Sequence, residues 1–166
     1  MTSRDLNDAA EDGFHGRLRQ VTRIQLSPET MRTAGMLRLE ALSAGTVGSR
    51  NLWMGETHVA PLTGSGVHHH GESETGIYVL SGRPAFVFFD GDALLRLEAS
   101  PGDYIYVPPW VAHQELNPHG SEEAVVVIAR NTQQAIVVNL DNVAWKDSLT
   151  VPWARTTEVP AEGTAS

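Results

Sequence analysis

The sequence contains no cysteine among its 166 residues. A disulfide framework, a thiolate-ligated structural zinc and a cysteine nucleophile are therefore excluded. No stretch approaches 18 consecutive apolar residues, and the first twenty residues lack the apolar core of a signal peptide. These absences are compatible with the cytosol, and a cytoplasmic protein is the expectation.

Basic residues are also scarce, with 12 Lys and Arg against 20 Asp and Glu, for a formal charge of −8. This balance argues against nucleic acid and against anionic membrane surfaces as partners. No basic helix-turn-helix segment is visible. The length, with 41% hydrophobic and 19% charged residues, fits one domain with a single substantial core.

The second half of the chain alternates short apolar segments with turns. The strands expected there cover residues 85–89, 93–99, 124–130 and 134–139, and Asp90-Gly91-Asp92 signals a hairpin. This spacing predicts an all-β antiparallel sandwich or barrel. We expect the barrel over residues 21–151, a flexible arm over 1–20 and a tail over 152–166.

The first third is less regular. Ser27-Pro28 fits a helix start, with Ser27 as the N-cap and Pro28 at the first helical position, so a short N-terminal helix is expected. Residues 36–42 alternate and are compatible with either a strand or a helix. Residues 43–49 hold two glycines and indicate a turn, and residues 51–60 indicate a strand.

A histidine cluster stands out in residues 64–82, GSGVHHHGESETGIYVLSG. A strand turns successive side chains to opposite faces at about 3.3 Å per residue, so His68 and His70 would share one face and His69 the other. Glu74 follows four residues after His70 as a possible oxygen ligand. Two histidines and a carboxylate are a ligand set expected of a divalent first-row metal.

A second segment, residues 101–117, reads PGDYIYVPPWVAHQELN: an apolar strand, a Pro-Pro turn and then His113. Together the two segments resemble the paired motifs of the cupin superfamily. The first motif is His-x-His, three or four residues, Glu, six residues, Gly. The second places Gly, Pro, His and Asn at fixed spacings, and the matching positions here are Gly102, Pro108, His113 and Asn117.

The chain departs from the family pattern at two positions. Trp110 stands where the family usually has Gly. Counting back from Gly82 puts the family's Glu at Thr75, whereas Glu74 lies one residue earlier and fits the three-residue variant of the gap. Glu72 shares the face of Glu74 and is the reserve carboxylate, and with Thr75 at that position the site would reduce to three histidines.

The resemblance implies a double-stranded β-helix, a small jelly-roll barrel, with His68, His70, Glu74 and His113 holding a divalent transition metal. Fe(II) is the favoured ion, and Mn, Ni, Cu and Zn fit the same ligand types. The resemblance further implies a metal-dependent enzyme whose partner is a small-molecule substrate, with a non-haem dioxygenase preferred. The alternatives are a metal-assisted isomerase or lyase, or a non-enzymatic module that binds a small molecule. A homodimer is expected, with residues 21–39 contributing to its interface. Tyr78, Tyr106 and Trp110 are candidates for the pocket wall.

Overall fold

The structure is a computed structural model that describes residues 18–28, 35–134, 136–141, 143 and 145. The arm expected over residues 1–20 and the tail over 152–166 lie largely or wholly outside the described residues. No helix in the described part is long and apolar enough to cross a membrane.

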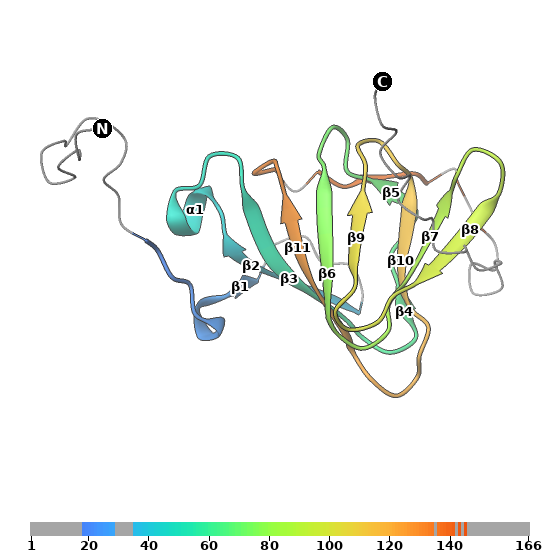
Figure 1. Ribbon diagram of the computed structural model, residues 1–166, viewed down its shortest axis with the longest axis horizontal. Helices are drawn as coiled ribbons and strands as arrows, with labels where there is room; N and C mark the ends of the chain where they lie inside the picture. Colours follow the sequence, from blue (N-terminus) through green and yellow to red (C-terminus); the bar gives the residue numbers. More distant parts are fainter. Residues whose placement is uncertain (1–17, 29–34, 135, 142, 144, 146–166) are drawn as a thin grey trace, which may run out of the picture.

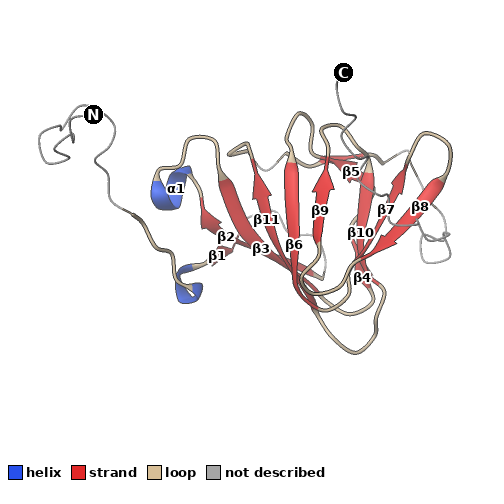
Figure 2. Ribbon diagram, viewed as in Figure 1, coloured by secondary structure: helices blue, strands red, loops and turns tan. Residues whose placement is uncertain are grey.

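The chain folds as two antiparallel sheets that face each other (Figures 1 and 2). Sheet A has the order β1 (Ser27–Pro28), β2 (Met36–Leu42), β3 (Trp53–Val59), β11 (Ala124–Arg130), β6 (Thr75–Ser81) and β9 (Tyr104–Val107). Sheet B has the order β12 (Val138–Asn139), β5 (His68–His69), β10 (His113–Asn117), β7 (Ala85–Phe89) and β8 (Leu94–Glu98), and β4 (Thr63–Gly64) also pairs with β10. Sequence neighbours are distributed between both sheets, as in a jelly roll, so the all-β prediction is confirmed.

Helix is limited to two short pieces, η1 (Arg23–Gln25) and α1 (Ala44–Val47). The helix expected at Ser27-Pro28 does not begin there, because both residues pair with β2 as strand β1. Residues 29–34, which would have continued it, are outside the described residues. The expected turn at 43–49 instead contains α1, where the Ser43 hydroxyl caps two backbone N–H groups and Gly48 ends the helix at φ 71°.

The segment 36–42, which the sequence left open, is strand β2. It pairs with β1 on one side and with β3 over its whole length on the other. This long-range pairing makes the segment a strand, although its local sequence is compatible with either a strand or a helix. Strand β3 then alternates between buried and half-buried positions from end to end. One side of sheet A therefore faces the barrel interior and the other faces outward.

The apolar core lies between the two sheets. Its buried residues are Ile77, Val79, Phe86, Ala99, Val107 and Val126, which come from both sheets. Burying each of the larger side chains stabilises the fold by about 1.5–3 kcal/mol relative to leaving it exposed. The core fills one part of the interior and leaves another for the polar residues described below.

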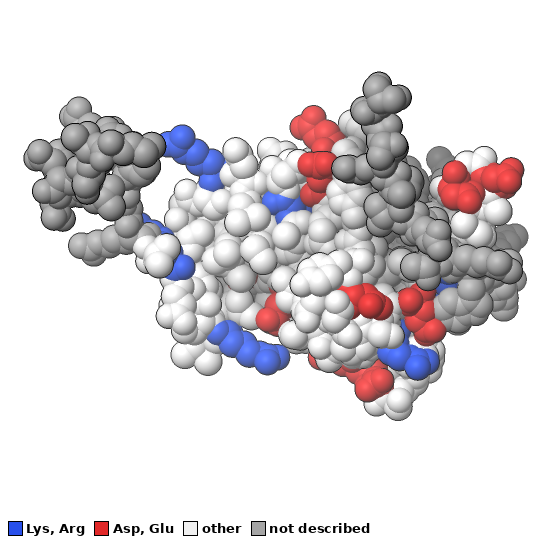
Figure 3. Space-filling model, viewed as in Figure 1, with Lys and Arg blue, Asp and Glu red and all other residues white. Residues whose placement is uncertain are grey.

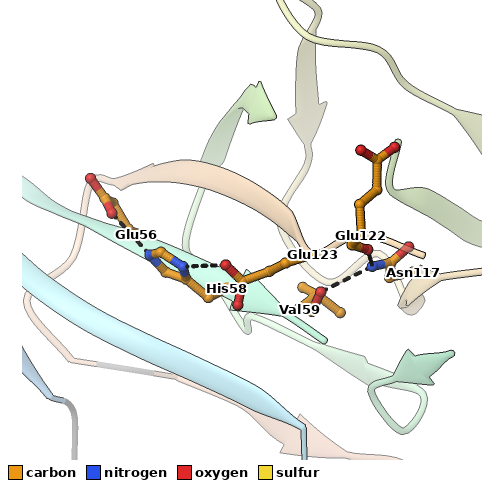
Figure 4. A network of polar contacts seen from close by, with 6 residues as sticks. All are labelled: Glu56, His58, Val59, Asn117, Glu122 and Glu123. Atoms are coloured by element: carbon orange, nitrogen blue, oxygen red, sulfur yellow. Dashed lines mark hydrogen bonds and ion pairs between the residues drawn. The ribbon is translucent and has the colours of Figure 1, made fainter. Parts of the chain in front are cut away.

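Asn117, the last residue of the second motif, ties β10 to sheet A. Its side-chain amide donates hydrogen bonds to the carbonyls of Val59 (3.0 Å) and Glu122 (2.8 Å), as Figure 4 shows. The residue is 1% exposed, so both hydrogen bonds are shielded from water. Asn117 therefore has a structural part in closing the barrel.

His58 lies on the outer side of β3 between two carboxylates (Figure 4). Its Nδ1 is 3.0 Å from Glu123 and its Nε2 is 3.0 Å from Glu56. Burial of the ring acts to lower its pKa, but the hydrogen bonds and charges of the two glutamates outweigh this, and the pKa of His58 is raised above 6.5. Leu37 and Val125 are its cross-strand neighbours and carry no charge.

A raised pKa makes the charged imidazole a pH-dependent source of stability. Its contribution is complete below the unfolded pKa of about 6.5 and is lost as pH rises through the higher folded value. We expect His58→Gln to flatten the fall of the melting temperature between about pH 6.5 and 8. Thermal unfolding of both proteins across that range measures this, and parallel curves would show that His58 does not carry the effect.

Candidate metal centre

Three of the predicted ligands meet inside the barrel. Strand β5 pairs with β10 so that His68 lies directly opposite His113, and His70 follows two residues after His68. The ring centroids are 4.4 Å apart for His68 and His113, 5.0 Å for His68 and His70, and 4.9 Å for His70 and His113. Strand parity and the meeting of the two motif segments, both inferred from the sequence, produce this arrangement.

The hydrogen bonds of the three rings set their tautomers. Nδ1 of each ring lies beside a backbone carbonyl: Gly66 for His68 (2.9 Å), Ile136 for His70 (3.0 Å) and Val111 for His113 (3.0 Å). Because a carbonyl can only accept, Nδ1 carries a proton, and in the neutral ring Nε2 therefore has the lone pair. Nε2 of His113 is buried and has no hydrogen-bond partner among the described residues. Each ring is thus oriented to offer Nε2 as a ligand atom.

The electrostatics favour neutral rings. Burial, followed by the nearby His113, lowers the pKa of His70 to about 4. Burial, followed by the nearby His68, also lowers the pKa of His113. Neutral imidazole is the form that binds a metal ion, so at neutral pH these two rings are already in the state that coordination requires.

The carboxylate of the group comes from Glu115. Among the described residues, one group of four could hold a metal ion: His68, His70, His113 and Glu115, with ligand atoms all within 4.8 Å of one another and every residue buried. Glu115 lies two residues after His113 on β10, so both side chains point to the same face of the strand.

Glu74, the carboxylate predicted from the sequence, lies outside this group. It is exposed, and its two oxygens accept hydrogen bonds from the Tyr106 hydroxyl (2.8 Å) and from the Asn131 amide (3.1 Å). Glu72, the reserve, is also exposed. The structure therefore places Glu115 beside the three histidines, and it places both predicted carboxylates, Glu74 and Glu72, at the surface before β6.

Thr75 occupies the position in the first motif where the family usually has Glu. It lies on the inner side of β6, is 1% exposed, and its hydroxyl has no hydrogen-bond partner among the described residues. The inward position is therefore kept, but it carries a hydroxyl in place of a carboxylate. In this chain the carboxylate beside the histidines, Glu115, lies on the other motif strand, β10.

His69 and Trp110 lie close together beside the site. His69 accepts a hydrogen bond from the Gly71 backbone N–H at 3.0 Å, and its ring centroid is 5.6 Å from that of Trp110. Trp110 has φ 65°, and its N–H donates to the carbonyl of Gly71 at 2.7 Å. The positive φ explains why the family usually has glycine at this position. The indole is 66% exposed, so it remains a candidate for an entrance wall.

The other two pocket candidates are placed differently. Tyr78 and Tyr106 alternate with the buried Thr75 and Ile77 across the β6–β9 pair, so both rings lie on the outer side of sheet A. Tyr78 packs there against Tyr104, with centroids 4.8 Å apart. Neither tyrosine lines the barrel interior.

Two of these placements could have been read from the sequence. His113-Gln114-Glu115 has the same alternation as His68-His69-His70, but the family pattern places the carboxylate in the first segment. The period of two also turns Tyr78 away from Ile77 and Val79, which are typical core residues.

Comparison with known proteins supports the family. The family model described as a cupin domain matches residues 55–129. No curated protein matches the chain. Among solved structures, the polyketide cyclase RemF from Streptomyces resistomycificus superposes with a TM-score of 0.63 at 21% identity, covering 80% of this chain and 90% of the cyclase. An S161A mutant of the oxalate decarboxylase from Bacillus subtilis superposes with a TM-score of 0.59 at 23% identity, covering 68% of this chain and 30% of the decarboxylase.

Residues 55–129 form a cupin domain, as the family-model match over them, the two motifs and the jelly-roll fold together show. The chain spans less than a third of the oxalate decarboxylase. A third similar structure, peruvianin-I from Thevetia peruviana latex, is described as a cysteine peptidase (TM-score 0.60, 17% identity, 82% of this chain and 83% of that chain). Neighbours with such different descriptions mean that the fold alone does not assign the activity.

Proposed function

We propose that this cupin is a metal-dependent enzyme that acts on a small organic molecule at the centre formed by His68, His70, His113 and Glu115. The observation that carries the proposal is the orientation of the three imidazole rings toward one another. Each has its Nδ1 beside a backbone carbonyl, and all three lie with Glu115 in one buried group. Three neutral nitrogens and one carboxylate fit a divalent transition metal.

A bound ion would act as a Lewis acid for a substrate oxygen, because four protein donors leave open positions on a six-coordinate metal. The chain's own residues would hold the ion in position and keep water away from it. The three carbonyl contacts fix the rings, and Phe86 and Phe88 lie directly opposite Glu115 and His113 on β7. These apolar neighbours exclude water and strengthen electrostatic interactions in the centre. The unpartnered hydroxyl of Thr75 is available to hydrogen-bond a substrate oxygen.

For the reaction we propose first a dioxygenase-type oxidation, with Fe(II) as the metal. Mixed nitrogen and carboxylate ligands with open positions suit iron and a chelating enolate or catecholate. A metal-assisted isomerase or lyase is the second candidate, and the described activities of two structural neighbours, a cyclase and a decarboxylase, favour it. The same decarboxylase is described with Mn(II) centres, so manganese is the alternative ion.

Metal analysis of protein purified without added metal is the direct test. We expect close to one equivalent of a divalent transition metal per chain in the wild type and a large loss in His113→Ala. His69→Ala is the matched control, because His69 is adjacent in sequence and lies outside the four-residue group, so it should retain the metal. Full retention by the His113 variant would contradict a metal centre at these residues.

Dioxygen consumption then separates the reaction classes. The Fe(II)-loaded protein is assayed with enols, catechols and β-diketones, with product analysis in air and under nitrogen. Turnover only in air supports the oxygenase, and turnover in both supports the isomerase or lyase. Saturable binding without turnover would identify a binding module.

A further inference from the structure

The inner side of sheet A carries a buried cation next to Thr75. Strand register places four residues in one row across β3, β11, β6 and β9: Trp53, Arg130, Thr75 and Val107. Each of them is at most 6% exposed, and Ile77, two residues after Thr75, belongs to the core between the sheets. The row therefore faces the barrel interior. Arg130 and Thr75 are direct cross-strand partners in it, and the Cβ atoms of such partners lie about 4.5–5.5 Å apart.

This row lies at the same end of the barrel as the metal centre, on the opposite sheet. Four residues connect His70 to Thr75, and five residues connect Val107 to His113. Each connection crosses between sheet B and sheet A, so the histidines and the row face each other near these two loops. Two sheets that pack face to face lie about 10 Å apart. A small molecule between them can therefore contact the metal centre and the row at the same time.

The guanidinium of Arg130 is held in a fixed position. Its central carbon lies 3.9 Å from the centroid of the Trp53 ring, where the face of the indole attracts a cation. The indole is itself fixed, because its Nε1–H donates a hydrogen bond to Glu40 at 3.1 Å. The other carboxylate oxygen of Glu40 accepts a hydrogen bond from the Ser43 hydroxyl at 2.7 Å. The cation is therefore preorganised before a ligand binds, which reduces the entropy cost of binding.

Arg130 and Thr75 together offer the donors that a carboxylate requires. A guanidinium has five N–H donors in a planar fork, so it can bind a ligand carboxylate while it also interacts with residues of the chain. The Thr75 hydroxyl is 1% exposed and has no hydrogen-bond partner among the described residues. An unpaired buried hydroxyl lowers stability, and a ligand oxygen would supply the missing partner.

The charges inside the barrel favour an anion, although those of the whole chain do not. The net charge is −8, and Figure 3 shows acidic groups at several places on the viewed face of the barrel. Inside, Glu115 would offset one charge of a divalent metal, and Glu40, beyond Trp53, offsets at most the charge of Arg130. One positive charge then remains for a ligand to neutralise, so selectivity for an anion would come from the interior.

We propose that Arg130 and Thr75 form a carboxylate-binding subsite opposite the metal centre, and that the substrate is a small organic acid. Its carboxylate pairs with the Arg130 guanidinium and accepts a hydrogen bond from the Thr75 hydroxyl, while a second oxygen lies at the metal centre. This inference rests on the proposed function, because the second oxygen requires the metal. It adds the chemical class of the substrate and the residues that select it.

Three ligands added to the Co(II)-loaded protein under nitrogen test the subsite: catechol, 3,4-dihydroxybenzoate and 3,4-dihydroxybenzamide. Catechol reports on the metal centre alone, and the acid and the amide differ in the charge of the group opposite the two hydroxyls. In the wild type we expect calorimetry to give a dissociation constant about 10- to 100-fold lower for the acid than for the amide. Arg130→Gln should remove this preference and keep its Co(II) and its affinity for catechol. Arg83→Gln is the matched control, because it removes the same charge from the exposed turn between β6 and β7 and should keep the preference.

Two further variants separate ligand binding from a structural role. Thr75→Val keeps the shape of the side chain and removes the unpaired hydroxyl, so the melting temperature of the metal-free protein should not fall. Its affinity for the acid should nevertheless fall by about 10-fold. Arg130→Lys keeps the charge without the planar fork, so its preference for the acid should lie between those of the wild type and Arg130→Gln. Circular dichroism checks that each variant is folded, and Arg130→Lys serves as the test if Arg130→Gln is not.

The outcomes distinguish this subsite from the metal centre. Equal affinity of the wild type for the acid and the amide, or an unchanged preference in the folded Arg130 variants, would overturn the subsite and leave the metal centre in place. Unchanged affinity for the acid in Thr75→Val would overturn the part of its hydroxyl. A wild type that takes up no Co(II), or that binds none of the three ligands when loaded, would overturn the proposed function and the subsite with it.

Discussion

Glu115→Ala is expected to weaken metal binding by at least about 100-fold, whereas Glu74→Ala should leave it nearly unchanged. Loss of residues that only support a ligand already costs 10–100-fold, so loss of a ligand itself should cost more. Glu115 is buried beside the three histidines, while Glu74 bonds Tyr106 and Asn131 at the surface. Titration calorimetry of the apo-protein with Mn(II) or Co(II) measures the difference.

The same pair of variants differs in metal-linked stability. A ligand that binds only the folded state stabilises it by about 2.7 kcal/mol at a free concentration 100 times its dissociation constant. Metal should therefore raise the melting temperature of the wild type and of Glu74→Ala. The rise for Glu115→Ala should be much smaller. Glu115→Gln keeps the shape of the side chain and an oxygen donor but removes the charge. Its metal-induced rise in melting temperature should therefore lie between those of the wild type and Glu115→Ala. Equal metal affinity of the wild type and Glu115→Ala would show that Glu115 is not a ligand.

The histidines of the site were predictable because their signal is local. Strand parity groups His68 with His70, and the second motif brings in His113. Glu115 carries the same parity signal relative to His113, but the family pattern places the carboxylate in the first segment. The orientation of Glu74 depends on contacts with Asn131 and Tyr106, which are distant in sequence. Such contacts exist only after the strands have paired.

The fold followed from the sequence for similar reasons. The spacing of strands and turns predicts an antiparallel β protein, and the motif resemblance selects the jelly roll. What the sequence left open, β2, is settled by pairing with β3 rather than by its own residues. Ser27-Pro28 has helix-start chemistry but joins a sheet edge, so tertiary pairing overrides a local capping preference there.

Gly82→Ala should lower the free energy of unfolding by about 2–5 kcal/mol. Gly82 ends β6 at φ 73°, where an L-residue costs roughly 1–2 kcal/mol. An added Cβ would also lie 2.6 Å from the Ala124 Cα and 2.6 Å from the Glu123 carbonyl oxygen. Both are backbone atoms, one in the first residue of the paired strand β11 and one in the residue just before it, so the crowding is relieved only by moving that strand. Overpacking of this kind costs about 1–3 kcal/mol. Urea unfolding of the apo-protein measures the change.

Gly102→Ala is the matched control, because it isolates the backbone term from the crowding term. Gly102 also has a positive φ, 99°, but a Cβ built there meets nothing within 4 Å. It should cost only the roughly 1–2 kcal/mol of the backbone conformation. Both glycines belong to the motif turns, so a difference between them reports the close approach of β6 and β11 rather than motif membership. Equal losses would show that β11 shifts freely, and that the short distances at Gly82 do not hold the two strands in place.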